Sequence, residues 1–265
     1  MHRTDRDTDL ATLLDEMGDP LDPDKYDWSL ASRYPLRDDE LFRLTYAAQV
    51  EWGTEGTFAS LNITRDPIVR RFLRIWLKQE IVHANLFARL LDEHGVDVVP
   101  LHRTRQQRLA AWRGQMVNRL ARAVVGRDFF GVHMTWGAVN ELTTLRFYGI
   151  IRDRTEHPLL AQILRDVMAQ EALHYSFYKR AATDRLRDNP RGQKVVRFAM
   201  RKLWSIVGTG LRSTEDADRL GLGIAEDAPG LIGVMDGAIG RIPGMKDLQL
   251  LAHYVEAARD RSSAA

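Results

Sequence analysis

Two copies of the pattern Glu-x-x-His stand far apart in this 265-residue chain, one at Glu80 and His83 and the other at Glu171 and His174. In an α-helix, side chains three residues apart lie on the same face, so each pair can direct one carboxylate and one imidazole toward a common point. Oxygen and imidazole donors of this kind suit iron or manganese. The two motifs therefore predict a metal centre to which two helices contribute.

The two motifs are parts of an internal repeat. Each is preceded by an upstream Glu, by a Thr three residues after that Glu, and by a Pro that lies 13 residues before the Glu of the motif. These residues are Glu51, Thr54 and Pro67 in the first half and Glu141, Thr144 and Pro158 in the second. Because Pro favours the first turn of a helix, each half is expected to form a helical hairpin whose second helix begins at the Pro.

The height of each Glu along its hairpin indicates which upstream carboxylates can act as ligands. Ligands on antiparallel neighbours must lie at the same height, and a helix rises 1.5 Å per residue. Glu141 lies about 11 residues before the expected end of its helix and Glu171 lies 13 residues after Pro158, so their heights agree within about 3 Å. Glu51 fits its own hairpin equally well, whereas Glu55 would lie about 6 Å higher. We expect Glu51 and Glu141 as ligands and Glu55 just outside them, with the exchange of Glu51 and Glu55 as the open alternative.

Long helices must carry these residues. Apolar side chains recur at three- and four-residue steps and no stretch alternates as a strand does, so the expected fold class is all-α. The expected helices cover residues 39–63, 67–94, 104–123, 128–152, 158–186 and 193–207. We expect an extended, Pro-punctuated lead-in over residues 1–38, a helical bundle over 39–207, and a tail over 208–265 with short helices at 231–239 and 245–259.

Composition excludes several kinds of site. The chain has no cysteine, so thiolate metal sites, iron–sulfur clusters and disulfides are ruled out, and any metal must be held by His and carboxylate. The 38 basic residues are balanced by 36 acidic ones, which does not indicate nucleic-acid binding. No apolar run approaches the ~20 residues of a membrane span, and no signal-peptide core opens the chain, so a cytoplasmic location is expected.

Two other histidines fit structural roles. His94 precedes Gly95 at the expected end of a helix and is expected to cap that end. His133 lies two turns before Glu141 and is expected to be a packed or capping residue.

The order Glu, Glu-x-x-His, Glu, Glu-x-x-His resembles the ferritin-like superfamily, and within it the soluble acyl-carrier-protein desaturases. Residues 37–41 are similar to the Pro-Asp-Asp-aromatic helix start of those enzymes, and residues 140–144 to their Gln-Glu-x-x-Thr segment. The likeness covers about residues 35–190. Thr54-Glu55 is a second match to the family's first ligand segment, which keeps Glu55 open. The polar residues that the family has between Glu and His of each motif are apolar here, which removes side chains that could orient the ligands.

The resemblance implies a ferritin-like four-helix bundle with additional helices and a pair of iron ions, with manganese as the alternative. The implied ligands are Glu51, Glu80, His83, Glu141, Glu171 and His174. Dioxygen would be the co-substrate and a ferredoxin-type protein the external electron donor. Thr144, and with it Thr54, would lie beside the oxygen site, the alternative being helix hydroxyls that donate to the carbonyl four residues back.

The resemblance also implies a reaction and partners. Hydrogen would be abstracted from an acyl chain held by an acyl-carrier protein, or from a similar small apolar substrate, and the basic stretches 103–127 and 179–202 would suit an acidic carrier. A homodimer is implied as well. The alternatives are a di-iron N-oxygenase or hydroxylase of a biosynthetic pathway, with His133 as a candidate additional His, and a non-catalytic ferritin-like metal-binding protein.

Overall fold

The computed structural model of the chain describes residues 9–61, 64–101 and 126–264. Within these ranges the regular elements are all helices and no strand forms, which confirms the all-α fold class. None of the described helices is long and apolar enough to cross a membrane. The expected helix at 104–123 lies outside the described residues.

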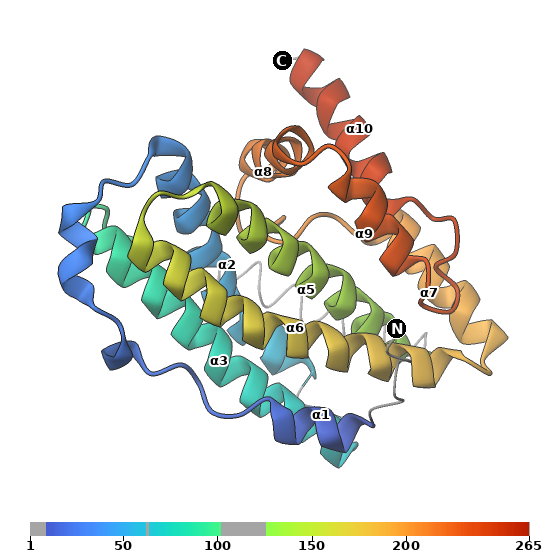
Figure 1. Cartoon of the computed structure of the whole chain (residues 1–265). Helices are drawn as coiled ribbons and strands as arrows, with labels where there is room; N and C mark the ends of the chain where they lie inside the picture. Colours follow the sequence, from blue (N-terminus) through green and yellow to red (C-terminus); the bar gives the residue numbers. More distant parts are fainter. Residues whose placement is uncertain (1–8, 62–63, 102–125, 265) are drawn as a thin grey trace, which may run out of the picture.

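Four long helices form two hairpins. α2 (Asp38–Leu61) packs along α3 (Pro67–Asp92), and α5 (Phe129–Arg154) packs along α6 (Pro158–Leu186). The hairpins meet through α3 and α6, which lie side by side (Figure 1). The predicted bounds of these four helices are confirmed to within two residues.

Both hairpin helices that start with Pro have a side chain that caps their first turn. The Asp66 carboxylate accepts the backbone N–H of Ile68 at 3.0 Å, with Pro67 at the first helical position. The His157 ring accepts the backbone N–H of Leu160 at 3.3 Å in the same way. These acceptors satisfy amide groups that have no partner inside the helix. Both helices begin at the Pro from which they were predicted to start.

Stacked aromatic side chains fill the space between the hairpins. The rings of Phe72 on α3 and Phe177 on α6 stack with centroids 3.9 Å apart, and Tyr178 meets Phe72 edge-on at 4.8 Å. Helix α5 approaches this cluster closely because Gly137 has no side chain, and a Cβ there would lie 2.4 Å from the Tyr178 ring. The core between the hairpins is thus closely packed around the positions of the Glu-x-x-His motifs.

The N-terminal residues are more structured than the expected extended lead-in. They form α1 (Leu10–Glu16), which is capped by Asp9, and two short 3-10 helices at Pro23–Lys25 and Trp28–Arg33. Apolar residues at helical spacing, including the buried Leu13 and Leu14, let α1 pack on α3 and α6.

The C-terminal residues form four helices on the side of α5 that faces away from α3 (Figure 1). They are α7 (Pro190–Leu203), α8 (Thr214–Asp227), α9 (Leu231–Ile239) and α10 (Leu250–Ala264). The helix at 231–239 is confirmed, and α8 was not predicted. The helix predicted from residue 245 begins at 250 instead, because Asp247 and Gln249 have φ values of 57° and 46°, which a helix does not allow.

The close approach at Gly137 gives the first prediction. In an open helix, Gly→Ala stabilises by about 1 kcal/mol. Gly137→Ala is expected to destabilise the protein instead, by about 1–3 kcal/mol, because the new methyl overlaps the packed Tyr178 ring. Gly56→Ala on α2, where no atom lies within 4 Å of the new Cβ, is the matched control and should stabilise. Urea unfolding measures the change in the free energy of unfolding for both variants. A change of the same sign in the two would contradict the close packing of Gly137 against Tyr178.

Candidate metal centre

The carboxylates and imidazoles selected by the repeat converge between the two hairpins. They are Glu51 on α2, Glu80 and His83 on α3, Glu141 on α5, and Glu171 and His174 on α6. Each of these residues is at most 7% exposed. Burying so many ionisable groups is unfavourable unless they are paired or bind a metal, which makes this cluster the candidate functional site.

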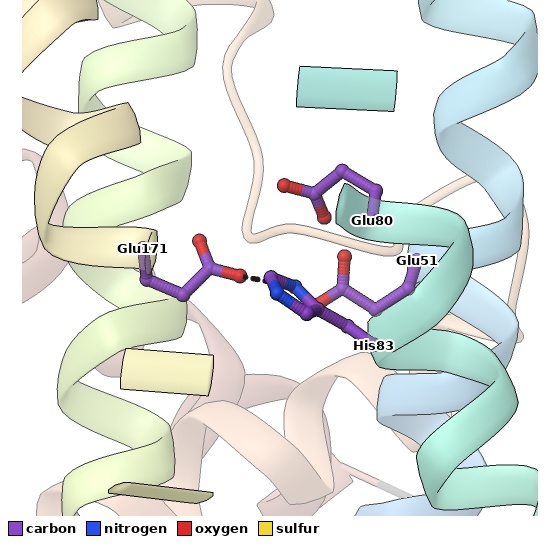
Figure 2. A group of neighbouring side chains, drawn as sticks. All are labelled: Glu51, Glu80, His83 and Glu171. Carbon is purple, nitrogen blue, oxygen red and sulfur yellow. Dashed lines mark ion pairs between the residues drawn. The ribbon is translucent and has the colours of Figure 1, made fainter. Parts of the chain in front are cut away.

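The six side chains form two groups of four. In each group the ligand atoms all lie within 4.8 Å of one another. The first group contains Glu51, Glu80, His83 and Glu171, and the second contains Glu141, Glu171, His174 and Glu80. Glu80 and Glu171 belong to both groups, so each group has one His and one Glu of its own and two carboxylates that it shares. Figure 2 shows Glu171 reaching across to His83 beside Glu51 and Glu80.

Each imidazole faces the shared carboxylate of the opposite hairpin. His83 Nδ1 lies 3.1 Å from Glu171 Oε1, and His174 Nδ1 lies 2.9 Å from Glu80 Oε1. Three of these atoms are fully buried without a hydrogen-bond partner, namely Glu80 Oε1, Glu171 Oε1 and His83 Nδ1. Buried acceptor atoms that converge without donors are rare in folded proteins. The cluster therefore fits cations at its centre.

Charge balance favours two divalent ions. Burial, together with the charge of neighbouring Glu171, raises the pKa of Glu80 and of Glu141 well above the usual range. Burial also raises the pKa of Glu51. Burial acts in the same direction on Glu171, but contacts with the two imidazoles outweigh it and hold the pKa of Glu171 below the usual range. Four ionised carboxylates would carry four negative charges, which two divalent cations would neutralise.

Two aromatic side chains hold the unshared carboxylates. Trp76 Nε1 donates to Glu141 Oε1 at 3.1 Å, and the Tyr148 hydroxyl donates to Glu51 Oε1. The sequence pattern predicts Trp76 only as an apolar core residue and does not single out Tyr148. The one available signal is general, because a buried Trp or Tyr needs a partner for its polar atom.

Two glutamines hold the imidazoles from the far side. His174 Nε2 lies 2.7 Å from Gln79 Oε1, and His83 Nε2 lies 2.8 Å from Gln170 Oε1. Each glutamine directly precedes the Glu of one motif and contacts the His of the other motif. The apolar residues inside the motifs offer no polar group for this role, and the partner of each His instead lies one position before the Glu of the other motif.

The remaining candidates lie outside both groups. Glu55 is exposed, one turn along α2 from the buried Glu51. The Thr54 hydroxyl donates to the backbone carbonyl of Glu51, so it behaves as a helix hydroxyl. Thr144 is partly buried on α5, three residues after Glu141. A role for Thr144 or Thr54 in oxygen chemistry stays a prediction.

The two additional histidines have the expected structural surroundings. His133 packs edge-on against Phe129 with ring centroids 4.3 Å apart, and burial lowers the pKa of His133 to about 4. It contributes to neither group. His94 Nδ1 lies 2.8 Å from the backbone oxygen of Leu90 in the last turn of α3, as expected of a residue that caps the helix end.

The raised carboxyl pKa values predict how the metal-free protein responds to pH. Glu80, Glu141 and Glu51 keep protons in the folded chain above about pH 4.3, where the unfolded chain has lost them. Alone, these three carboxyls would make stability fall as pH rises from about 5 toward neutrality, since the folded state binds more of their protons. His174, His133 and His157, whose pKa values are lowered mainly by burial, act in the opposite direction below about pH 6.5. The carboxyl contribution is therefore the difference in slope between the protein and a variant that lacks carboxyls.

Urea unfolding of chelator-treated protein at several pH values measures this dependence. The double substitution of Glu80 and Glu141 by Gln removes two of the groups, so stability should fall less, or rise more, with pH than in the unsubstituted protein. Equal slopes in the two proteins would contradict the prediction.

Comparison with known proteins gives no match for this chain: no family model matches the sequence, and no curated protein or solved structure is significantly similar. The likeness to desaturases is thus a resemblance of motif residues alone. What the chain binds must be inferred from its own side chains.

Proposed function

We propose that this protein holds two metal ions bridged by Glu80 and Glu171, and that with iron it acts as a dioxygen-dependent oxidoreductase. The observation that carries the proposal is the sharing of these two carboxylates by two four-residue groups. A single ion needs one group, whereas two groups joined by two carboxylates match the ligand set of a dinuclear centre. His83 and His174 would then each bind one ion.

The donor set favours iron or manganese. Four carboxylates and two imidazoles without thiolate form an oxygen-rich set that suits these ions. Two helices contribute one Glu each, and two others contribute a Glu-x-x-His motif each. This is how ferritin-like di-iron and di-manganese carboxylate proteins supply their ligands. A ferritin-like bundle is accordingly part of the proposal.

The residues of this chain would prepare the centre in three ways. Glu80 and Glu171 would hold the two ions at one height in the bundle. Trp76 and Tyr148 would orient the unshared carboxylates through the bonds described above. The apolar side chains packed around the cluster would keep bulk water out. When bound, an iron pair supplies the redox chemistry that reduces dioxygen, and an external donor of the ferredoxin type would return the electrons.

The proposed reaction is hydrogen abstraction from an acyl chain on a carrier protein, or from a similar apolar substrate. The motif resemblance supports this class, and the aromatic packing around the centre suits an uncharged reactive carbon. An N-oxygenase with a third His is less well supported, because His133 lies outside both groups. Analysis of products from acyl-carrier substrates and from arylamines, with reduced protein and dioxygen, separates the two. We expect a dehydrogenated acyl product, and an oxidised arylamine alone would favour the alternative.

Metal analysis tests the centre itself. The protein loaded with ferrous iron is expected to bind about two ions per chain and to change its optical spectrum when oxygen is added. Glu51→Gln should lower the iron content toward one ion or less, because it removes an unshared ligand. Glu55→Gln, one turn further on the exposed face, is the matched control and should bind as the unsubstituted protein does. Less than one iron per chain with no response to oxygen would overturn the proposed function.

A further inference from the structure

We infer that Gln79 and Gln170 are positioning residues of the centre, and that the backbone of Met17–Asp19 is part of it. The two glutamine amides connect carbonyl groups of this N-terminal segment to the two imidazoles. This inference rests on the proposed metal centre and adds to it a defined coordinating atom and a third structural unit, which lies outside both hairpins.

Backbone carbonyls fix the orientation of both amides. Gln79 Nε2 donates to Met17 O at 2.8 Å and also faces Gly18 O at 3.3 Å, while Gln170 Nε2 donates to Asp19 O at 2.9 Å. A carbonyl oxygen can only accept, so the amide nitrogen must point toward the segment. The amide oxygen of each glutamine must then point toward an imidazole.

This orientation decides which ring nitrogen remains free to bind a metal. The amide oxygen beside each ring can only accept, so the Nε2 atoms of His83 and His174 must carry the hydrogen. A neutral imidazole then keeps its lone pair on Nδ1. In both residues Nδ1 is the atom that faces a shared carboxylate. The glutamines therefore select Nδ1 as the coordinating atom at both ion positions.

The connection crosses between the hairpins. Gln79 lies on α3 and holds His174 on α6, whereas Gln170 lies on α6 and holds His83 on α3. Both glutamines are buried, at 0% and 8% exposure, so water cannot readily replace the backbone carbonyls as acceptors. If the segment moved away, the amides would lose the contacts that set their orientation.

A glycine turn brings the segment to the glutamines. Helix α1 ends at Glu16, and Gly18 follows with a φ of +64°, a conformation that favours glycine. Met17 beside it is buried. No atom lies within 4 Å of the position where a Gly18 Cβ would stand, so a Cβ there strains the turn without a clash. Gly95 after α3 has the same features, with a φ of +74° and open space, and it lies twelve residues beyond His83.

These two glycines give a matched experiment with Co²⁺ as the probe, in the full chain. Gly18→Val is expected to weaken Co²⁺ binding by roughly 10- to 100-fold and to alter its visible absorption spectrum, because the imidazoles lose their orienting partners. Gly95→Val imposes the same kind of backbone strain away from the centre. It should leave the Co²⁺ affinity and the visible absorption spectrum unchanged. Gly18→Asn, which tolerates positive φ, should restore binding. Gln79→Met, which removes the amide but not the turn, should resemble Gly18→Val.

Histidine nitrogen resonances provide a second measurement that general loss of stability would not reproduce. In the Zn²⁺-loaded protein both His83 and His174 should be protonated at Nε2 and bound through Nδ1. The inference is overturned if either ring is bound through Nε2, or if Gly18→Val and Gln79→Met bind Co²⁺ as well as Gly95→Val does. An unsubstituted protein that binds neither Co²⁺ nor iron would overturn the proposed function, and with it this inference.

Discussion

The burial of four carboxylates between two apolar hairpins is the constraint that governs this molecule. Moving an ionised carboxylate out of water costs several kcal/mol even after relaxation. The six-residue cluster contains two imidazoles but four carboxylates, so it cannot balance its own charge. Protons carry the excess when no metal is bound, which is the physical content of the raised pKa values at Glu80 and Glu141. A fold that maintains such a cluster gives up stability to keep these potential metal ligands together.

The two halves of the repeat contribute the same types of residue to the cluster but hold them with different hydrogen-bond donors. Replacing each residue of one four-residue group by its counterpart in the other half of the repeat gives the other group. The unshared carboxylates are nevertheless held differently, one by the indole N–H of Trp76 and the other by the phenol of Tyr148. Burial and the neighbouring Glu51 raise the pKa of Tyr148, so its hydroxyl keeps its hydrogen and remains a donor. The two four-residue groups are thus equivalent in residue types and unequal in surroundings.

Helices outside the two hairpins pack against them on both sides. Helix α1 covers α3 and α6 on one side, and the C-terminal helices cover α5 on the other (Figure 1). Asp227 at the end of α8 pairs with Arg43 at 2.5 Å and with Arg154 at 2.9 Å, which ties the tail to one helix of each hairpin. Both ends of the described chain therefore support the hairpins that position the cluster.

Local rules sufficed to predict the six converging side chains and the four helices that carry them. Helical periodicity and a fixed rise per residue act over short distances, so the Pro, Glu and His spacings determine which side chains share a face and a height. The preference for Glu51 over Glu55 followed from this rise alone, and the structure places Glu51 inside the cluster and Glu55 on the surface.

Tertiary packing alone decided what surrounds those ligands. Trp76 meets Glu141 from 65 positions away, and Gln170 meets Asp19 from 151 positions away. Such contacts depend on how the hairpins and the N-terminal segment dock, and they leave no periodic pattern in the chain. The same reason explains why α1 was expected to be extended, since the apolar face of so short a helix has meaning only once α3 and α6 lie beneath it.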